Sequence, residues 1–392
     1  MMTLKLEAKS AKKTSSSMSA EFSDKLNPLD DRTWSQFFPD HPDSAEMIGL
    51  MGDCGMDEFE FSSIIVKNDD GPLLLLPLFT THYDLTTTLS GSALQLAGAA
   101  KAILPRLLRP KVLGVGFVEG EWGEVGFDRN ASLESLERAW LVAIEALNRA
   151  AKRLQAQLIA FKDFTFESGK NLPINKLTAF SCVNSMPYCQ MELRFASLED
   201  YLKTLDPDLR RYLKRAEKKR QDLRITYENQ VGPWIDQVYE LYLEQVKQSE
   251  SSFGVHRREY FERICDTVPG ARYVLYYLAD KLIAFELLVE RKNSLIQKYI
   301  GMDREAGRDY KIFFVSWLEN IRYCLDKGIT HTHIGASQEK LKSELGCSLV
   351  PSAVLTRHVD PVMNRLLKFA LPELEYVSKV PVTKPVLGSM WI

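Results

Sequence analysis

The stretch YVLYYLADKLIAFELLV, residues 273–289, decides the fold of the second half of the chain. Tyr273–Leu278 and Ile283–Val289 are apolar runs of strand length, rich in aromatic and branched side chains. The short polar turn Ala279–Lys281 joins them, and this pattern predicts a β-hairpin. We therefore expect an antiparallel pair of strands at the centre of this half.

The elements around this hairpin alternate between strands and helices. Downstream, we expect a strand at 295–300, a helix at 310–326 that ends at Gly328, and a strand at 331–335. The first half has a comparable order: a hairpin (62–66 and 73–76, closed by Asp70-Gly71), helices at 92–108 and from Ser132, and a strand at 157–161 that ends at Lys162-Asp163. Such alternation predicts an α/β protein with mixed sheets.

Composition excludes several classes of protein. The chain has 392 residues, of which 26% are charged, and a formal net charge of -2. It is therefore neither a strongly basic nucleic-acid binder nor an acidic disordered chain. None of the six cysteines forms a CxxC pair, which is typical of free cysteines in a reducing compartment. With no apolar signal core and no apolar run of membrane-spanning length, we expect a cytoplasmic protein.

The length allows two or three domains, and the pattern favours two similar halves. Residues 1–30 are polar without periodicity, which predicts a disordered leader. We expect an N-terminal domain at 31–195 and a C-terminal domain at 196–360. Residues 361–392 are apolar and interrupted by prolines, which predicts a tail packed on the body.

Several segments of the second half together point to a known family. They are the basic helix LRRYLKRA (209–216), Ala284-Phe285-Glu286 in the hairpin, Tyr299 near the end of the next strand, Lys327-Gly328, and IGASQEKLKSELG (334–346). This ordered series, over about residues 195–350, resembles the Fem-like branch of the GNAT acyltransferase superfamily, a branch similar to peptidoglycan-biosynthesis enzymes. The resemblance implies two tandem GNAT-like domains, each a mixed, mostly antiparallel sheet flanked by helices.

The resemblance also implies transfer of an acyl or aminoacyl group to an amine. The expected co-substrate is an acyl-CoA or acyl-carrier thioester, with no permanently bound cofactor. The GNAT pyrophosphate loop, Gln/Arg-x-x-Gly-x-Gly/Ala, is not evident, but residues 301–307 and the following helix N-terminus occupy its place. Arg304 and Arg308 there, with Arg211 and Lys214 of the basic helix, are candidate ligands for donor phosphates.

Amine acylation requires a base, an oriented amine and a stabilised oxyanion. Glu286 is a candidate base, because the apolar residues on either side of it predict a raised pKa. The alternative is an outward-facing partner for Lys298 or Arg291.

Five further side chains are site candidates. Asp163 is expected to position the amine and Lys162 to bind an acidic group, unless the two form a surface ion pair. Tyr299 is expected to donate to the donor carbonyl or the leaving group, unless it serves packing. In the segment that best resembles the family, Ser337 and Lys342 are expected to bind substrate, with Lys342 on an anionic group.

Three functional hypotheses follow. The first is an N-acyltransferase that moves an acyl group from acyl-CoA or an acyl-carrier protein to a small-molecule, cell-wall or peptide-like amine. The second is an aminoacyl-tRNA-dependent transferase. The lack of aromatic residues interleaved in the basic helix and of a long heptad coiled-coil insertion modestly disfavours it. The third is a non-catalytic binding module of the same fold. No metal site is expected, since His331 and His333 have no third ligand at short spacing.

Overall fold

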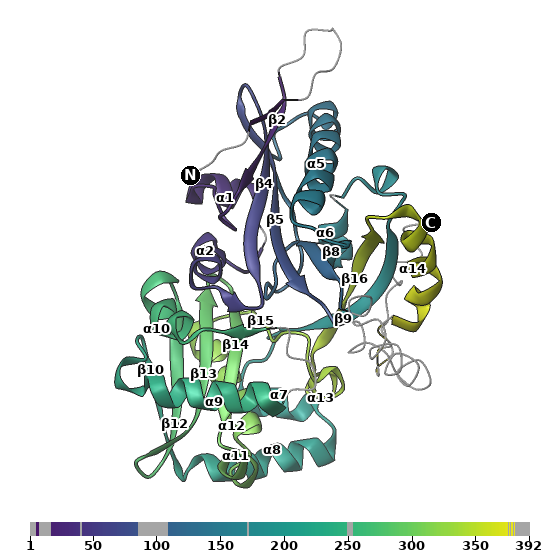
Figure 1. Cartoon of the computed structure of the whole chain (residues 1–392). Coiled ribbons are helices and arrows are strands. Elements are labelled where there is room, and N and C mark those ends of the chain that lie inside the picture. Colours follow the sequence, from purple (N-terminus) through teal and green to yellow (C-terminus); the bar gives the residue numbers. More distant parts are fainter. Residues whose placement is uncertain are drawn as a thin grey trace. The chain divides into compact units, whose positions relative to one another are not determined.

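The computed structural model describes residues 5–7, 17–39, 41–84, 109–170, 172–248, 254–374, 376, 378 and 380 (Figure 1). These residues divide into two compact units. Unit 1 comprises Met1–Met186, Pro351–Ser378 and Val382–Ile392, and unit 2 comprises Pro187–Val350 and Lys379–Pro381. The helix expected at 92–108 lies outside the described residues.

The sheet of unit 1 is mixed and mostly antiparallel. Its strand order is β1 (Lys5–Glu7), β2 (Ser19–Ser23), β4 (Glu60–Asn68), β5 (Gly71–His82), β6 (Lys111–Val115), β8 (Leu158–Thr165) and β16 (Ser348–His358), with β7 (Gly126–Phe127) on β5. Only β6 and β8 pair in parallel among these strands. The predicted hairpin is confirmed as β4 and β5, with the turn closed at Asn68 and Gly71.

Helix α5 (Leu133–Arg153) covers this sheet. Ser132 caps it as predicted, since the Ser132 hydroxyl accepts from the backbone N–H of Ser135. Its alanine-rich inner face packs on β2, β4 and β5 and joins the core of unit 1. The remaining elements are α1 (Asp31–Phe37), α2 (Ala45–Cys54), β3 (Met56–Asp57), α6 (Phe166–Gly169), a 3-10 turn (Ile174–Lys176), the first half of β9 (Ser181–Glu192) and α14 (Pro361–Leu374).

The part of the sheet that lies in unit 2 is also mixed. Its order is the end of β9, β15 (His331–His333), β14 (Ser294–Met302), β13 (Lys281–Arg291), β12 (Ala271–Leu278) and β10 (Leu223–Glu228). The decisive hairpin is confirmed as β12 and β13, and β14 and β15 form the parallel pair.

Helices cover both faces of this sheet. One face packs on α7 (Leu198–Thr204), α8 (Pro207–Arg220) and α12 (Ile312–Lys327), and the other on α9 (Ile235–Gln248) and α10 (Arg258–Thr267). Short elements complete the unit: a 3-10 turn (Gly232–Trp234), β11 (Val255–His256), α11 (Arg304–Asp309) and α13 (Glu339–Glu344). Gly328 adopts a left-handed φ of 69° and ends α12, as predicted.

Three details differ from the expectations. Ser19–Ser23 pair with β4, so this part of the expected leader belongs to the sheet. The strand expected to end at Lys162-Asp163 continues to Thr165. The main segment of unit 2 ends at Val350, because β16 continues into unit 1 and pairs with β8 there.

Candidate functional site

Two parallel strands of unit 2 separate from one another. β14 and β15 pair only at Ser294–Ile296 and His331–His333. Beyond this point β14 continues along β13, whereas the backbone N–H of Ile334 donates to the carbonyl oxygen of Cys189 at 2.9 Å. In the described part of the chain, β14 therefore has no strand neighbour on that side after Ile296.

Tyr299 lies on this part of β14 and forms a close pair with His256. Its hydroxyl oxygen is 2.6 Å from Nε2 of His256, a contact between residues 43 positions apart in the chain. The imidazole is buried and stacks on the Tyr260 ring with centroids 4.1 Å apart. The backbone N–H of His256 donates to the hydroxyl of Tyr242 at 3.0 Å. Helices α9 and α10 thus fix the imidazole, and the sequence does not show this pair because its members come from separate elements.

Glu286 and Tyr299 lie on opposite faces of the sheet. Tyr299 pairs with Leu287, the neighbour of Glu286 on β13, and adjacent strand residues point to opposite faces. Tyr299 contacts Phe261 of α10, whereas Glu286 contacts Asn320 of α12. The structure therefore does not bring these two candidates together at one reacting atom.

Glu286 is held in a buried polar cluster. Its carboxylate accepts from the Asn320 amide at 2.7 Å and from the Tyr276 hydroxyl at 3.4 Å. Burial raises the pKa of Glu286 to about 7, only partly opposed by these hydrogen bonds. The raised pKa agrees with the prediction, while the alternative of an outward-facing partner for Lys298 or Arg291 is wrong, since the side chain is 3% exposed.

Lys342 lies beside the point where β15 leaves β14. Its ammonium is buried and donates to the carbonyl oxygen of Ile334 at 2.6 Å. The preceding turn contains Gly335 and Gln338, both in the left-handed region with φ of 68° and 59°. Ser337, the other candidate in this segment, is exposed. The Lys342 ammonium thus lies at the C-terminal end of β15, where this strand leaves β14. Ser337 belongs to the same segment of the chain, five residues before Lys342.

Lys162 and Asp163 lie in unit 1 and form an ion pair with each other. The Asp163 carboxylate also accepts from the hydroxyl of Ser185 at 2.5 Å. Both side chains are mostly buried, at 17% and 16% exposed, so this is not the surface pair considered as the alternative. Asp163 has a left-handed φ of 54°, an irregularity within β8.

Unit 1 has its own pair of separating parallel strands, and its own chain fills the space between them. β6 and β8 pair from Val112–Val115 to Leu158–Phe161. Beyond this, Gly123 forms a parallel bridge with Phe164, and its N–H donates to the carbonyl oxygen of Asp163 at 2.9 Å. A Cβ on Gly123 would lie 1.8 Å from the Lys162 carbonyl oxygen, so only glycine fits. An extended substrate cannot bind here while this loop is in place.

The four candidate phosphate ligands are exposed. Arg211 pairs with Asp208, and Lys214 with Glu199 at 3.1 Å. Arg308 pairs with its neighbour Asp309 at 3.1 Å. Arg304 begins α11, whose N-terminus is capped by the carboxylate of Asp303.

The phosphate-loop pattern is kept in part. Arg304 to Gly307 match its first four positions, but Asp309 stands where the pattern has glycine or alanine. The segment forms the short helix α11. An acidic side chain at that position weakens the attraction for a pyrophosphate.

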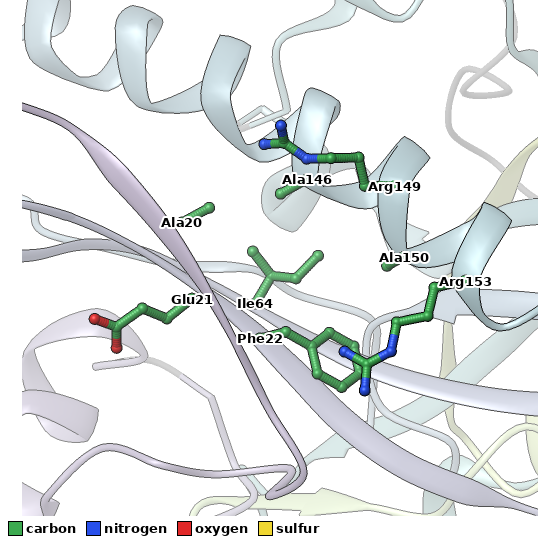
Figure 2. Close-up of a pocket in the computed structure, with 8 residues that line it drawn as sticks. All are labelled: Ala20, Glu21, Phe22, Ile64, Ala146, Arg149, Ala150 and Arg153. Carbon is green, nitrogen blue, oxygen red and sulfur yellow. The ribbon is translucent and has the colours of Figure 1, made fainter. Parts of the chain in front are cut away.

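A cavity of about 180 Å³ lies in unit 1 between α5 and strands β2 and β4 (Figure 2). Its floor is apolar, and Arg153 lies over the Phe22 ring with its guanidinium carbon 5.2 Å from the centroid. Arg149 also lines the cavity and forms an ion pair at 2.8 Å with Glu145, which does not line it. None of the predicted site residues lines this cavity.

A metal site is not found among the described residues. No group of three or more His, Cys, Asp or Glu side chains in them is placed to hold an ion. His331 is exposed, and its Nδ1 lies 2.8 Å from the hydroxyl of Thr330.

Comparisons with known proteins agree with this architecture. Residues 207–343 match the family model described as acetyltransferase (GNAT) domain. The crystal structure of FemX has a TM-score of 0.54 with 12% identity, covering 87% of this chain and 98% of that one. The C-terminal domain of a putative lysylphosphatidylglycerol synthetase from Agrobacterium fabrum has a TM-score of 0.50 with 13% identity, covering 83% and 90%. A search of the curated proteins finds no similar sequence. Residues 207–343 thus match the acetyltransferase (GNAT) domain family, and the fold of the chain is similar to that of FemX.

Proposed function

We propose that unit 2 carries an N-acyltransferase site along β14 beyond Ile296, where β15 no longer pairs with it. The observation that carries the proposal is the 2.6 Å contact between Tyr299 and His256 next to the separated strands. An acyl thioester lies along the backbone of β14, and the acceptor amine approaches from the side of α9 and α10. The donor is an acyl-CoA or an acyl-carrier thioester, and the acceptor is a small-molecule, cell-wall or peptide-like amine.

The Tyr299–His256 pair supplies the proton transfer that this reaction requires. The amine nitrogen attacks the thioester carbonyl carbon, and the C–S bond breaks as the amide forms. The Tyr299 oxygen takes one proton from the nitrogen while it passes its own to Nε2 of His256. The imidazolium returns that proton through Tyr299 to the sulfur, so the products are an amide and a thiol.

Lys342 and Ser337 are proposed as substrate-binding residues at the other side of the opening. The buried ammonium of Lys342 places a positive charge at the end of β15. Such a charge stabilises the oxyanion of the tetrahedral intermediate or an anionic substrate group. Glu286 faces α12, on the face of the sheet opposite to Tyr299. It is therefore proposed to affect the reaction only indirectly, by holding the strands in place, and not to contact the substrate.

The loop at Gly123 supports the assignment to unit 2. This loop occupies the space between β6 and β8, so the opening between these two strands of unit 1 is filled by the chain itself. Lys162 and Asp163, which bond to each other there, are proposed to hold this loop or an acceptor group rather than the thioester.

The test is an activity assay of the full chain with several classes of acyl donor. Acyl-CoAs of several chain lengths, acyl-carrier thioesters and aminoacyl-tRNA are each offered with an amine mixture, and products are identified by mass spectrometry. Tyr299→Phe is expected to lower kcat about 100-fold, because it removes the proton relay. Tyr227→Phe, on the distant strand β10, is the matched control. If Tyr299→Phe has the same kcat as the wild type, the proposed role of this pair is refuted.

The aminoacyl-tRNA alternative is favoured by one observation. The outward face of α8 carries Arg211, Lys214, Arg215 and Lys218, all exposed. Such a row suits a phosphate polymer, and binding would weaken steeply with salt. Absence of tRNA binding at low salt would eliminate this alternative.

A further inference from the structure

Helix α14 of unit 1 is firmly held along one side. The side chain of Asp360 caps its N-terminus, accepting from the backbone N–H groups of Val362 and Met363 at 2.9 Å each. The Asn364 amide donates to the carbonyl oxygen of Ala179 at 3.0 Å, and Leu371 is buried. Because Asn364 and Leu371 lie seven residues apart, they mark one face of the helix as the packed face.

The opposite face of α14 is apolar and open to solvent. Val362, Leu366 and Phe369 are 66%, 57% and 83% exposed. Each residue of an α-helix is rotated by about 100° from the one before it. Val362, Leu366 and Phe369 therefore project from the same side of α14, opposite Asn364 and Leu371. We call them the outward stripe of α14. Surface helices normally place charged residues there, so an apolar stripe marks a surface that binds a partner.

Two cations border the outward stripe on one side only. Arg365 and Lys368 are both exposed. The sequence of α14, PVMNRLLKFALPEL, contains these two cations and one acid. The partner must therefore accept apolar side chains and offer negative charge beside them.

A second copy of this helix paired antiparallel fits that requirement poorly. When two identical helices pair antiparallel around a two-fold axis, the same flank of each faces the other. Arg365 and Lys368 would then lie opposite the same cations of the partner. A bilayer with anionic lipids meets both demands, because the stripe enters the acyl boundary while the long cationic side chains reach the headgroup phosphates.

We propose that the outward stripe of α14, with Arg365 and Lys368, binds the surface of an anionic lipid bilayer. No helix among the described residues is long and apolar enough to cross a membrane. Three apolar side chains and two cations give weak, reversible binding that depends on anionic lipid. The proposal does not rest on the acyl-transfer activity of unit 2.

The experiment is vesicle flotation of the full chain. Vesicles of phosphatidylcholine with one third phosphatidylglycerol are compared with vesicles of phosphatidylcholine alone. The wild type is expected to float only with the anionic vesicles. The double variant Leu366→Ser/Phe369→Ser is expected to lose about tenfold or more of the binding, and Arg365→Glu/Lys368→Glu the preference for anionic lipid.

A matched control separates the stripe from general surface hydrophobicity. Leu133 of α5 belongs to the same unit and is 82% exposed, so Leu133→Ser removes a comparable apolar group elsewhere. This variant is expected to bind vesicles like the wild type, and circular dichroism checks that each variant is folded. Equal flotation of the stripe variant and the wild type would overturn the proposal. A concentration-dependent dimer that the stripe variant abolishes would instead assign this face to a second copy.

Discussion

Glu286 makes the folding stability of unit 2 depend on pH in a specific direction. Its pKa is raised from 4.5 to about 7 in the folded state, chiefly by burial. The folded state therefore holds the proton more tightly than the unfolded state does. The stabilisation is complete below the unfolded pKa, is lost progressively as pH rises toward 7, and stays lost above it.

The magnitude follows from the shift. A difference of about 2.5 pKa units corresponds to about 3 kcal/mol, of which about 2 kcal/mol is lost between pH 5.5 and pH 8.5. Glu286→Gln is neutral at every pH, and its amide can still accept from Asn320. The variant is expected to gain about 2 kcal/mol relative to the wild type over this pH interval.

Urea unfolding of the wild type and Glu286→Gln at several pH values measures this difference. Glu240→Gln, an exposed glutamate on α9, is the control for removal of one carboxylate. Taking differences between variants cancels the contributions of all other titrating groups. Parallel pH profiles for the wild type and Glu286→Gln would refute the reasoning, because they would mean that the buried carboxyl has an ordinary pKa.

The remaining predictions concern packing. Gly123→Ala is expected to cost about 3 kcal/mol of stability, because its Cβ would lie 1.8 Å from the Lys162 carbonyl oxygen; thermal unfolding measures this. Gly49→Ala is the control, since nothing lies within 4 Å of its added Cβ, and it should be neutral or stabilising. Tyr201→Phe removes a buried hydroxyl that donates to the Leu345 carbonyl at 2.9 Å and accepts from the Trp317 indole at 2.8 Å. It should cost about 1–3 kcal/mol in chemical unfolding, and an unchanged midpoint would contradict the role of this network.

Sequence patterns were most informative where the structure is local. The hairpin at 273–289 and the cap at Ser132 follow from strand-length apolar runs, turn residues and a capping hydroxyl. The raised pKa of Glu286 was also predictable, because its neighbours on the strand are apolar. The sequence did not indicate which face of the sheet the Glu286 side chain occupies. That depends on which helix packs against which face.

The sequence by itself determined the class of fold, the order of elements in unit 2 and several candidate residues. Only the tertiary structure paired Tyr299 with His256 and separated Tyr299 from Glu286. Likewise, only the folded chain places Gly123 between β6 and β8 and leaves the outward stripe of α14 uncovered. The physical reason is that hairpins, caps and helices depend on neighbours along the chain. Contacts across a sheet depend instead on strand register and on long-range packing, which no short sequence pattern records.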